Sequence, residues 1–189
     1  DSARHFVDYP AGKTRLVFTP TANHNVLKIF SGERYVVYKE GHRLSKDSKS
    51  AMKEKGTTRA GGSVACLALD MLIHVGCDPI FLIGQDCAFS GNRYYSSQSQ
   101  FNNQLQSKII RTTPLGKLHH DKALEKKQLA VQCTQGNPLV TDQVMYSYLR
   151  TLEHIIKANP GTRVFNLYSH GAEIEHAPVL GSANEIKRR

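Results

Sequence analysis

Short β-rich runs and stretches of helical apolar spacing alternate along the chain. Arg15–Thr19 is a β-rich run that ends before Pro20, and Ala22–Phe30 then carries apolar residues at helical spacing. A second β-rich run occupies Arg34–Tyr38. A strand, a helix and a strand within about two dozen residues predict a βαβ unit with a parallel sheet.

The clearest helical pattern lies near the middle of the chain. Six apolar residues follow the spacing i, i+3, i+4, i+7, i+8, i+11: Val64, Leu67, Ala68, Met71, Leu72 and Val75. Ser63 is the expected N-cap and Gly76 the expected C-cap. The apolar run Ile80–Ile83 is typical of a strand buried on both faces. One core is predicted to contain four of these residues: Leu67, Leu72, Leu82 and Ile83.

Helical and strand patterns return after a polar segment. Gln, Asn, Ser and Lys dominate residues 90–137, where we expect an irregular excursion. Within and after it the sequence predicts helices over Ser99–Ile110 and Asp121–Lys127, a strand over Leu129–Gln132 and a turn at Gln135–Pro138.

A long helix and a last strand are predicted after this turn. Thr141 is the expected N-cap of the helix, and the strand covers Val164–Leu167. The apolar face of the helix is predicted to comprise Val144, Tyr148, Leu152, Ile155 and Ile156. The alternation of strands and helices predicts an α/β domain with a mostly parallel sheet.

Length and composition favour one globular domain over residues 1–189. No apolar stretch approaches the ~20 residues that a membrane span needs, so no span is expected. The chain starts without Met or a signal-peptide core, so we expect it to be a fragment of a longer one. The four cysteines form no CxxC pair, which favours reduced thiols and a cytoplasmic location. Sequence alone indicates no oligomeric state.

The charge of the chain is strongly positive. It has 25 Lys and Arg against 16 Asp and Glu, a formal charge of +9. Residues 39–60 form a predicted mobile basic loop, since Lys39–Arg59 holds seven Lys and Arg and three acidic residues. Aromatic residues are not interleaved with these charges, and no zinc-finger or RRM signature is present. A phosphorylated small molecule is therefore favoured over nucleic acid as partner.

Ligands of open α/β sheets bind beyond the carboxyl ends of the strands, which directs attention to the residues after Ile83. These are Gly84, Gln85 and Asp86: a residue for a sharp turn, a donor and acceptor, and a carboxylate that can accept a proton or hold a cation. A simple polar turn explains them equally well.

A second candidate is the sequence Gly61-Gly62-Ser63, which precedes the central helix. At a helix N-terminus it can bind phosphate, although many αβ loops use the same residues only to turn and cap.

Other polar groups are weaker candidates. His119 and His120 lack a ligand partner at i+4, so a solvated pair is favoured over a metal site. The loop after the last strand carries four groups suited to metal binding or acid–base work, for most of which a surface role is favoured: His170, Glu173, Glu175 and His176. His74 fits a satisfied histidine, and Ser63 has no evident Ser-His-Asp arrangement.

Two segments resemble the MptE-like domain family. They are GGSVACLALDMLIHVGCDPIFLIGQDCAF (Gly61–Phe89) and PLVTDQVMYSYLRTLEHIIKANPGTRVFNLYSHGAEI (Pro138–Ile174). The family includes archaeal 6-hydroxymethylpterin diphosphokinases and bacterial motility-associated factors, which are flagellin glycosyltransferases. The match is more similar to the bacterial branch, which implies a Rossmann-like three-layer, sialyltransferase-like domain.

The resemblance also implies a function and a site. It implies transfer of a CMP-activated nonulosonic acid to Ser and Thr hydroxyls of a protein such as flagellin. Gly61, Gly62 and Ser63 would face the donor phosphate, and Gln85 and Asp86 the sugar or acceptor. Thr141 and Asn166 would complete the pocket.

Two alternatives stay open at this stage. One is a pterin diphosphokinase that uses ATP and Mg²⁺, with Asp86 as a metal ligand. The other is a non-catalytic module that binds a protein partner through its basic loop.

Overall fold

A computed structural model describes residues 14–41, 50, 54–59, 61–89, 128–167 and 170–181. Several predictions fall outside these residues: both helices of the polar excursion, the His119–His120 pair and most of the basic loop. The chain divides into two compact units, residues 1–60 and residues 61–189, which are described separately. One domain over the whole chain stays a prediction.

The first unit contains the predicted βαβ arrangement. Strand β1 (Leu16–Phe18), helix α1 (His24–Ile29) and strand β2 (Arg34–Val36) follow one another, and β1 pairs in parallel with β2. Asn23 begins the helix, since its side chain accepts a hydrogen bond of 2.9 Å from the backbone N–H of Asn25. The parallel pairing predicted from the sequence is therefore confirmed.

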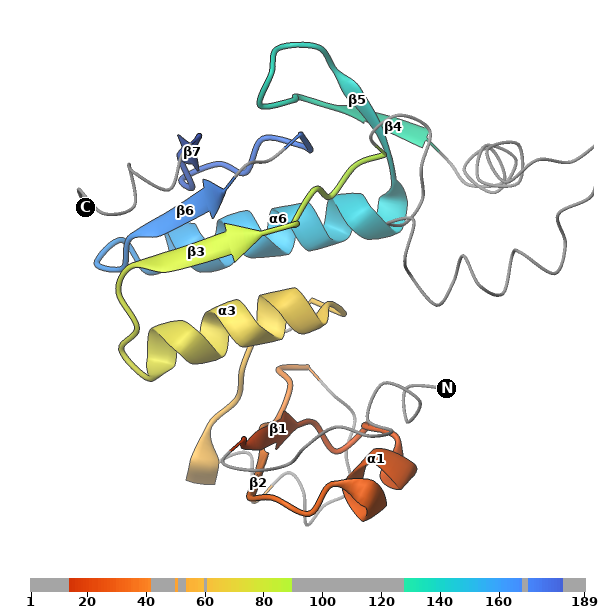
Figure 1. Cartoon of the computed structure of the whole chain (residues 1–189), viewed down its shortest axis with the longest axis vertical. Coiled ribbons are helices and arrows are strands. Elements are labelled where there is room, and N and C mark those ends of the chain that lie inside the picture. Colours follow the sequence, from red (N-terminus) through yellow and green to blue (C-terminus); the bar gives the residue numbers. More distant parts are fainter. Residues whose placement is uncertain are drawn as a thin grey trace, which may run out of the picture. The chain divides into compact units, whose positions relative to one another are not determined.

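Within its described residues, the second unit contains two helices and two small sheets (Figure 1). Its elements are α3 (Val64–His74), β3 (Ile80–Ile83), β4 (Gln128–Val131), β5 (Leu139–Asp142), α6 (Gln143–Lys157), β6 (Val164–Leu167) and β7 (Val179–Leu180). Strands β3, β6 and β7 form a parallel sheet in the order β3-β6-β7, whereas β4 and β5 form an antiparallel hairpin. Helices combined with small parallel sheets are compatible with the predicted α/β class.

Helices α3 and α6 contribute to one core with alternate residues of the parallel sheet. The main buried contributors are Cys66 and Leu69 from α3, Leu149, Leu152 and Ile155 from α6, and Ile80, Leu82 and Val164 from the strands. The intervening strand residues form a second cluster on the other face, where the rings of Phe81 and Phe165 stack at 5.7 Å. No helix in the described ranges has the length and apolarity to cross a bilayer.

The predicted apolar face of α3 is wrong. Val64 and Val75 are 82% and 67% exposed, whereas Cys66, Leu69 and Asp70 are buried. The helix is apolar nearly all around its circumference, so spacing alone does not fix the buried side. The helix begins at Val64 with Ser63 as its N-cap, as expected, but its C-cap is Val75 and not Gly76.

The sequence predicts that β3 is buried on both faces, and this prediction is wrong at Ile83, the last residue of the strand. Leu82 is 8% exposed and lies in the core, but Ile83 is 70% exposed. Successive side chains of a strand point to opposite faces, and the far face is not covered by described residues at Ile83.

Helix α6 begins one residue later than predicted. Asp142 is the N-cap, since its Oδ1 accepts a hydrogen bond of 2.8 Å from the backbone N–H of Met145. Thr141 instead belongs to β5, where it pairs with Leu129. Val144, expected on the apolar face, is 48% exposed, whereas Leu152, Ile155 and Ile156 are buried as expected.

Candidate functional site

The loop that leaves β3 runs from the parallel sheet to the hairpin. Gly84 turns the chain with a φ of +67°, and Cys87 adopts a φ of +50°. The backbone N–H of Phe89 then donates a hydrogen bond of 2.8 Å to the carbonyl of Val140 on β5. Gln85 and Asp86, the candidate catalytic residues, therefore lie in a loop that is held at both ends.

The backbone of Asp86 is also fixed from the loop after β6. Its carbonyl accepts a hydrogen bond of 2.7 Å from the backbone N–H of Ala172. Gly171 packs so closely that a Cβ there would overlap the Asp86 backbone. The exits of two neighbouring parallel strands thus meet at Asp86, as expected for the carboxyl edge of such a sheet.

Thr141 binds this loop through a side-chain hydrogen bond. It is fully buried, and its hydroxyl donates a hydrogen bond of 2.7 Å to the carbonyl of Cys87, the residue after Asp86. Thr141 therefore binds the residue that directly follows Asp86 in the loop. Direct contact of Thr141 with a ligand stays a prediction.

Replacing Thr141 by valine should destabilise the chain. Valine has nearly the same shape but no donor, so the half-buried Cys87 carbonyl would lose this bond at a cost of about 1–3 kcal/mol. Thr141→Ser keeps the hydroxyl and should lose less. The free energy of unfolding from urea titrations measures both. A valine variant as stable as the wild type would show that the bond contributes nothing.

The Cys87 thiol is not a nucleophile at neutral pH. Burial, with smaller contributions from the charges of Cys66, Asp86 and Glu153, raises its pKa to about 12. Only the thiolate is a strong nucleophile, and here the thiol stays protonated. Of the residues in this loop, Asp86 and Gln85 are left to carry polar chemistry.

The glycine-led N-terminus of α3 packs against α6. Gly61 and Gly62 have φ values of +50° and +84°, and a Cβ on Gly61 would overlap the side chain of Thr151. The Ser63 hydroxyl accepts a hydrogen bond of 3.2 Å from the backbone N–H of Ala65. Turning, capping and close packing thus account for these residues, and phosphate binding stays a prediction.

Asn166 lies in the middle of the site's supporting sheet. It pairs with Leu82 in the register of β3 and β6, and it is fully buried. Neither polar atom of its side chain has a hydrogen-bond partner among the described residues. Its predicted role in ligand binding is not tested by these contacts.

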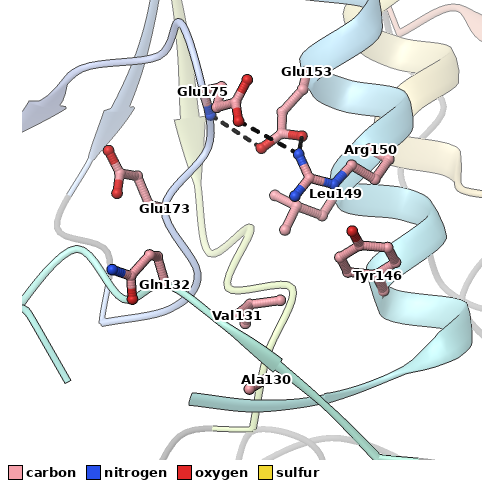
Figure 2. A pocket seen from close by; sticks show the side chains of 9 residues that line it. All are labelled: Ala130, Val131, Gln132, Tyr146, Leu149, Arg150, Glu153, Glu173 and Glu175. Atoms are coloured by element: carbon pink, nitrogen blue, oxygen red, sulfur yellow. Dashed lines mark hydrogen bonds and ion pairs between the residues drawn. The ribbon is translucent and has the colours of Figure 1, made fainter. Parts of the chain in front are cut away.

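A cavity of about 290 Å³ opens beside this edge of the sheet (Figure 2). Residues of β4, of α6 and of the loop after β6 line it: Ala130, Val131, Gln132, Tyr146, Leu149, Arg150, Glu153, Glu173 and Glu175. The loop after β6 forms one wall of the cavity from Glu173 onward. The residue before it, Ala172, donates its backbone N–H to the Asp86 carbonyl. The backbone N–H of Glu173 binds the Gln132 carbonyl at 2.8 Å and joins this wall to β4.

Arg150 connects the two walls of the cavity. Its Nη1 lies 2.7 Å from Glu153 Oε2 and 3.5 Å from Glu175 Oε1. The second oxygen of Glu153, Oε1, accepts a hydrogen bond of 3.2 Å from the backbone N–H of Glu175. The guanidinium also lies over the Tyr146 ring, 5.0 Å from its centre (Figure 2). Hydrogen bonding to Tyr146 and the charge of Glu153 raise the pKa of Arg150, which stays charged.

Sequence reasoning found only part of this cavity. Glu173 and Glu175 were singled out, but Arg150, Glu153 and Tyr146 were not. One signal was present: Glu153 interrupts the apolar face of α6 between Leu152 and Ile155, and a buried carboxylate needs a partner.

His170 and the remaining acidic residues do not add a metal centre to the described part of the chain. The Nδ1 of His170 lies 2.7 Å from Gln135 Nε2, at the turn of the hairpin. Across the described residues, no three His, Cys, Asp or Glu side chains are grouped to hold a metal ion.

Comparison with known proteins gives one finding. Residues 1–92 match the model of a family described as 6-hydroxymethylpterin diphosphokinase MptE-like. The matched residues include Gly61–Phe89, the first segment that resembles the family, but not Pro138–Ile174. Searches of curated proteins and of solved structures found no significant match.

Proposed function

We propose, from the match of residues 1–92 to the MptE-like family model, that the protein is a transferase domain that acts on a phosphorylated small molecule. The family description supports this class of substrate, and the positive charge of the chain suits an anionic ligand. The observation that carries the proposal is the meeting of two strand exits at Asp86, beside a cavity.

Within this class, the proposed activity is that of a cytoplasmic glycosyltransferase. The donor is a nucleotide-activated sugar of the CMP-nonulosonic acid type, and the acceptor is a Ser or Thr hydroxyl of a protein such as flagellin. The proposed architecture is the Rossmann-like, sialyltransferase-like domain that the resemblance implies.

The roles of the individual residues follow from their positions. Asp86 orients a sugar hydroxyl or accepts the acceptor proton, and Gln85 supplies a donor and an acceptor beside it. Gly61, Gly62 and Ser63 face the donor phosphate at the N-terminus of α3. Gly84 provides the turn. Thr141 and Asn166 complete the site, Thr141 by holding the loop through Cys87.

Pterin diphosphokinase activity is the second candidate, because it is what the family description names. Such a reaction would use ATP and Mg²⁺, and Mg²⁺ in phosphoryl-transfer sites is commonly held by one or two carboxylates together with the substrate phosphates. Asp86 is the residue that would contribute a carboxylate here. Among the described residues, no three His, Cys, Asp or Glu side chains are grouped to hold the ion.

A nucleotide panel read by thermal shift separates these candidates. Stabilisation by CMP or CDP without metal is expected, and a ligand at 100 times its dissociation constant stabilises the native state by about 2.7 kcal/mol. Stabilisation by ATP only in the presence of Mg²⁺ would favour the diphosphokinase. No response to any nucleotide, in the full-length protein as well, would overturn both and favour a non-catalytic binding module.

A further inference from the structure

The cavity is acidic although the chain is basic. Its described lining holds three carboxylates, from Glu153, Glu173 and Glu175, and one guanidinium, from Arg150, which gives these residues a net formal charge of −2. This sign is opposite to the formal charge of +9 for the whole chain. A phosphate or a carboxylate that entered the cavity would therefore meet net repulsion.

The guanidinium of Arg150 does not offset this repulsion, because it is already engaged. It lies 2.7 Å from Glu153, whose carboxylate is only 8% exposed, and 3.5 Å from Glu175. A bidentate grip on an anion would require the guanidinium to leave a buried carboxylate behind without its counter-charge, which is costly.

The remaining polar atoms of the cavity are mostly acceptors. The exposed carboxylate of Glu173 and the side chain of Gln132 lie on the wall opposite α6 (Figure 2). Ala130, Val131 and Leu149 add an apolar surface between the polar groups. Such a mixture suits a ring that presents hydroxyl or ammonium groups at its edge and C–H groups on its face.

The volume of the cavity limits the size of the ligand that it can bind. The volume of about 290 Å³ lies just below the range of ~300–1,000 Å³ for small-molecule pockets. A single ring-sized group fits this volume better than a whole nucleotide sugar does.

We propose that the cavity is a subsite for a ring-sized group that is neutral or cationic and rich in hydrogen-bond donors, and that it excludes anionic groups. Resting on the proposed function, this makes the cavity distinct from the site of the anionic donor. The phosphorylated and carboxylated donor then lies outside it, toward Asp86 and the N-terminus of α3.

Three sugars with the same ring test the charge preference: glucosamine, glucose and glucuronate. Each is titrated into the ¹⁵N-labelled full chain, and amide shifts are followed by NMR. Glucosamine should bind tightest, with shifts in residues 130–132, 146–153 and 173–175, and glucuronate about tenfold more weakly or not at all. Equal or tighter binding of glucuronate, shifts confined to other residues, or no shifts with any sugar would overturn the proposal.

A charge reversal gives the matched variant. Glu173→Lys replaces an exposed carboxylate, so the fold should persist, and because the net charge of the described lining becomes zero, glucosamine should lose its advantage over glucuronate. The control Glu40→Lys makes the same change at an exposed position of the first unit and should leave that advantage unaltered. An advantage of glucosamine in Glu173→Lys as large as in the wild type would overturn the proposal. Because no nucleotide is used, failure here leaves the nucleotide panel intact, and failure of that panel leaves the charge preference of the cavity intact.

Discussion

Asp86→Asn is expected to lower transfer by about 10²-fold or more while the melting temperature stays near that of the wild type. Asparagine keeps the shape of the side chain and removes its charge, so it can neither accept the acceptor proton nor stabilise developing positive charge. The backbone contacts of Asp86 with Ala172 and Gly171 do not depend on the carboxylate, and the loop should persist. Turnover in the reaction that the nucleotide panel identifies is measured together with thermal unfolding.

The matched control is Asp78→Asn, at the opposite end of the same strand. Asp78 lies just before β3, where its carboxylate pairs with Arg163 at 3.1 Å and both side chains are about half exposed. This variant should keep transfer within a few-fold of the wild type. If folded Asp86→Asn behaves in the same way as the control, Asp86 is a turn residue and its catalytic assignment is wrong.

Leu82→Ala should destabilise the protein by about 2–5 kcal/mol, the range for large-to-small changes in a core. Leu82 is 8% exposed and packs under the two helices in the same cluster as Leu152. Its neighbour Ile83 is 70% exposed, so Ile83→Ala should change stability by no more than about 0.5 kcal/mol. Urea unfolding of both variants gives the comparison.

The contrast between these neighbours tests which face of β3 is covered. A loss below about 1 kcal/mol for Leu82→Ala would mean that its side chain is not packed in the core. A large loss for Ile83→Ala would mean that the far face of the sheet is covered at this position. Either result would contradict the arrangement in which α3 and α6 cover one face.

The elements around β3 could be predicted because several local signals agree there. Ser63 caps α3, Gly76 follows its end with a φ of +79°, and an apolar run of strand length comes next. The buried face of α3 could not be predicted, because apolar residues surround this helix and only packing against α6 selects Cys66 and Leu69. At Thr141 and Asp142 two good capping residues are adjacent, and pairing of Thr141 with Leu129 in the hairpin decides between them.

The sequence likewise predicts one part of the candidate site and not the other. Asp86 follows from a general rule, since polar residues after a buried parallel strand lie at the ligand-binding edge. The cavity does not follow from any local pattern. In the sequence, Arg150 and Glu153 form an ordinary i, i+3 pair of the kind found on solvated helix faces. The cavity forms because, in the folded chain, the loop that carries Glu173 and Glu175 lies against Arg150 and Glu153.

Residue-level mapping of a bound nucleotide tests the central claim, that the carboxyl edge of β3 and β6 binds the phosphorylated substrate. CMP, and separately ATP with Mg²⁺, is titrated into the ¹⁵N-labelled full chain. The account predicts that the largest amide shifts fall on Gly84–Phe89, at the exit of β3, and on Gly61–Ser63, at the start of α3. Saturable shifts confined to residues 14–59, with none in these two segments, would contradict it.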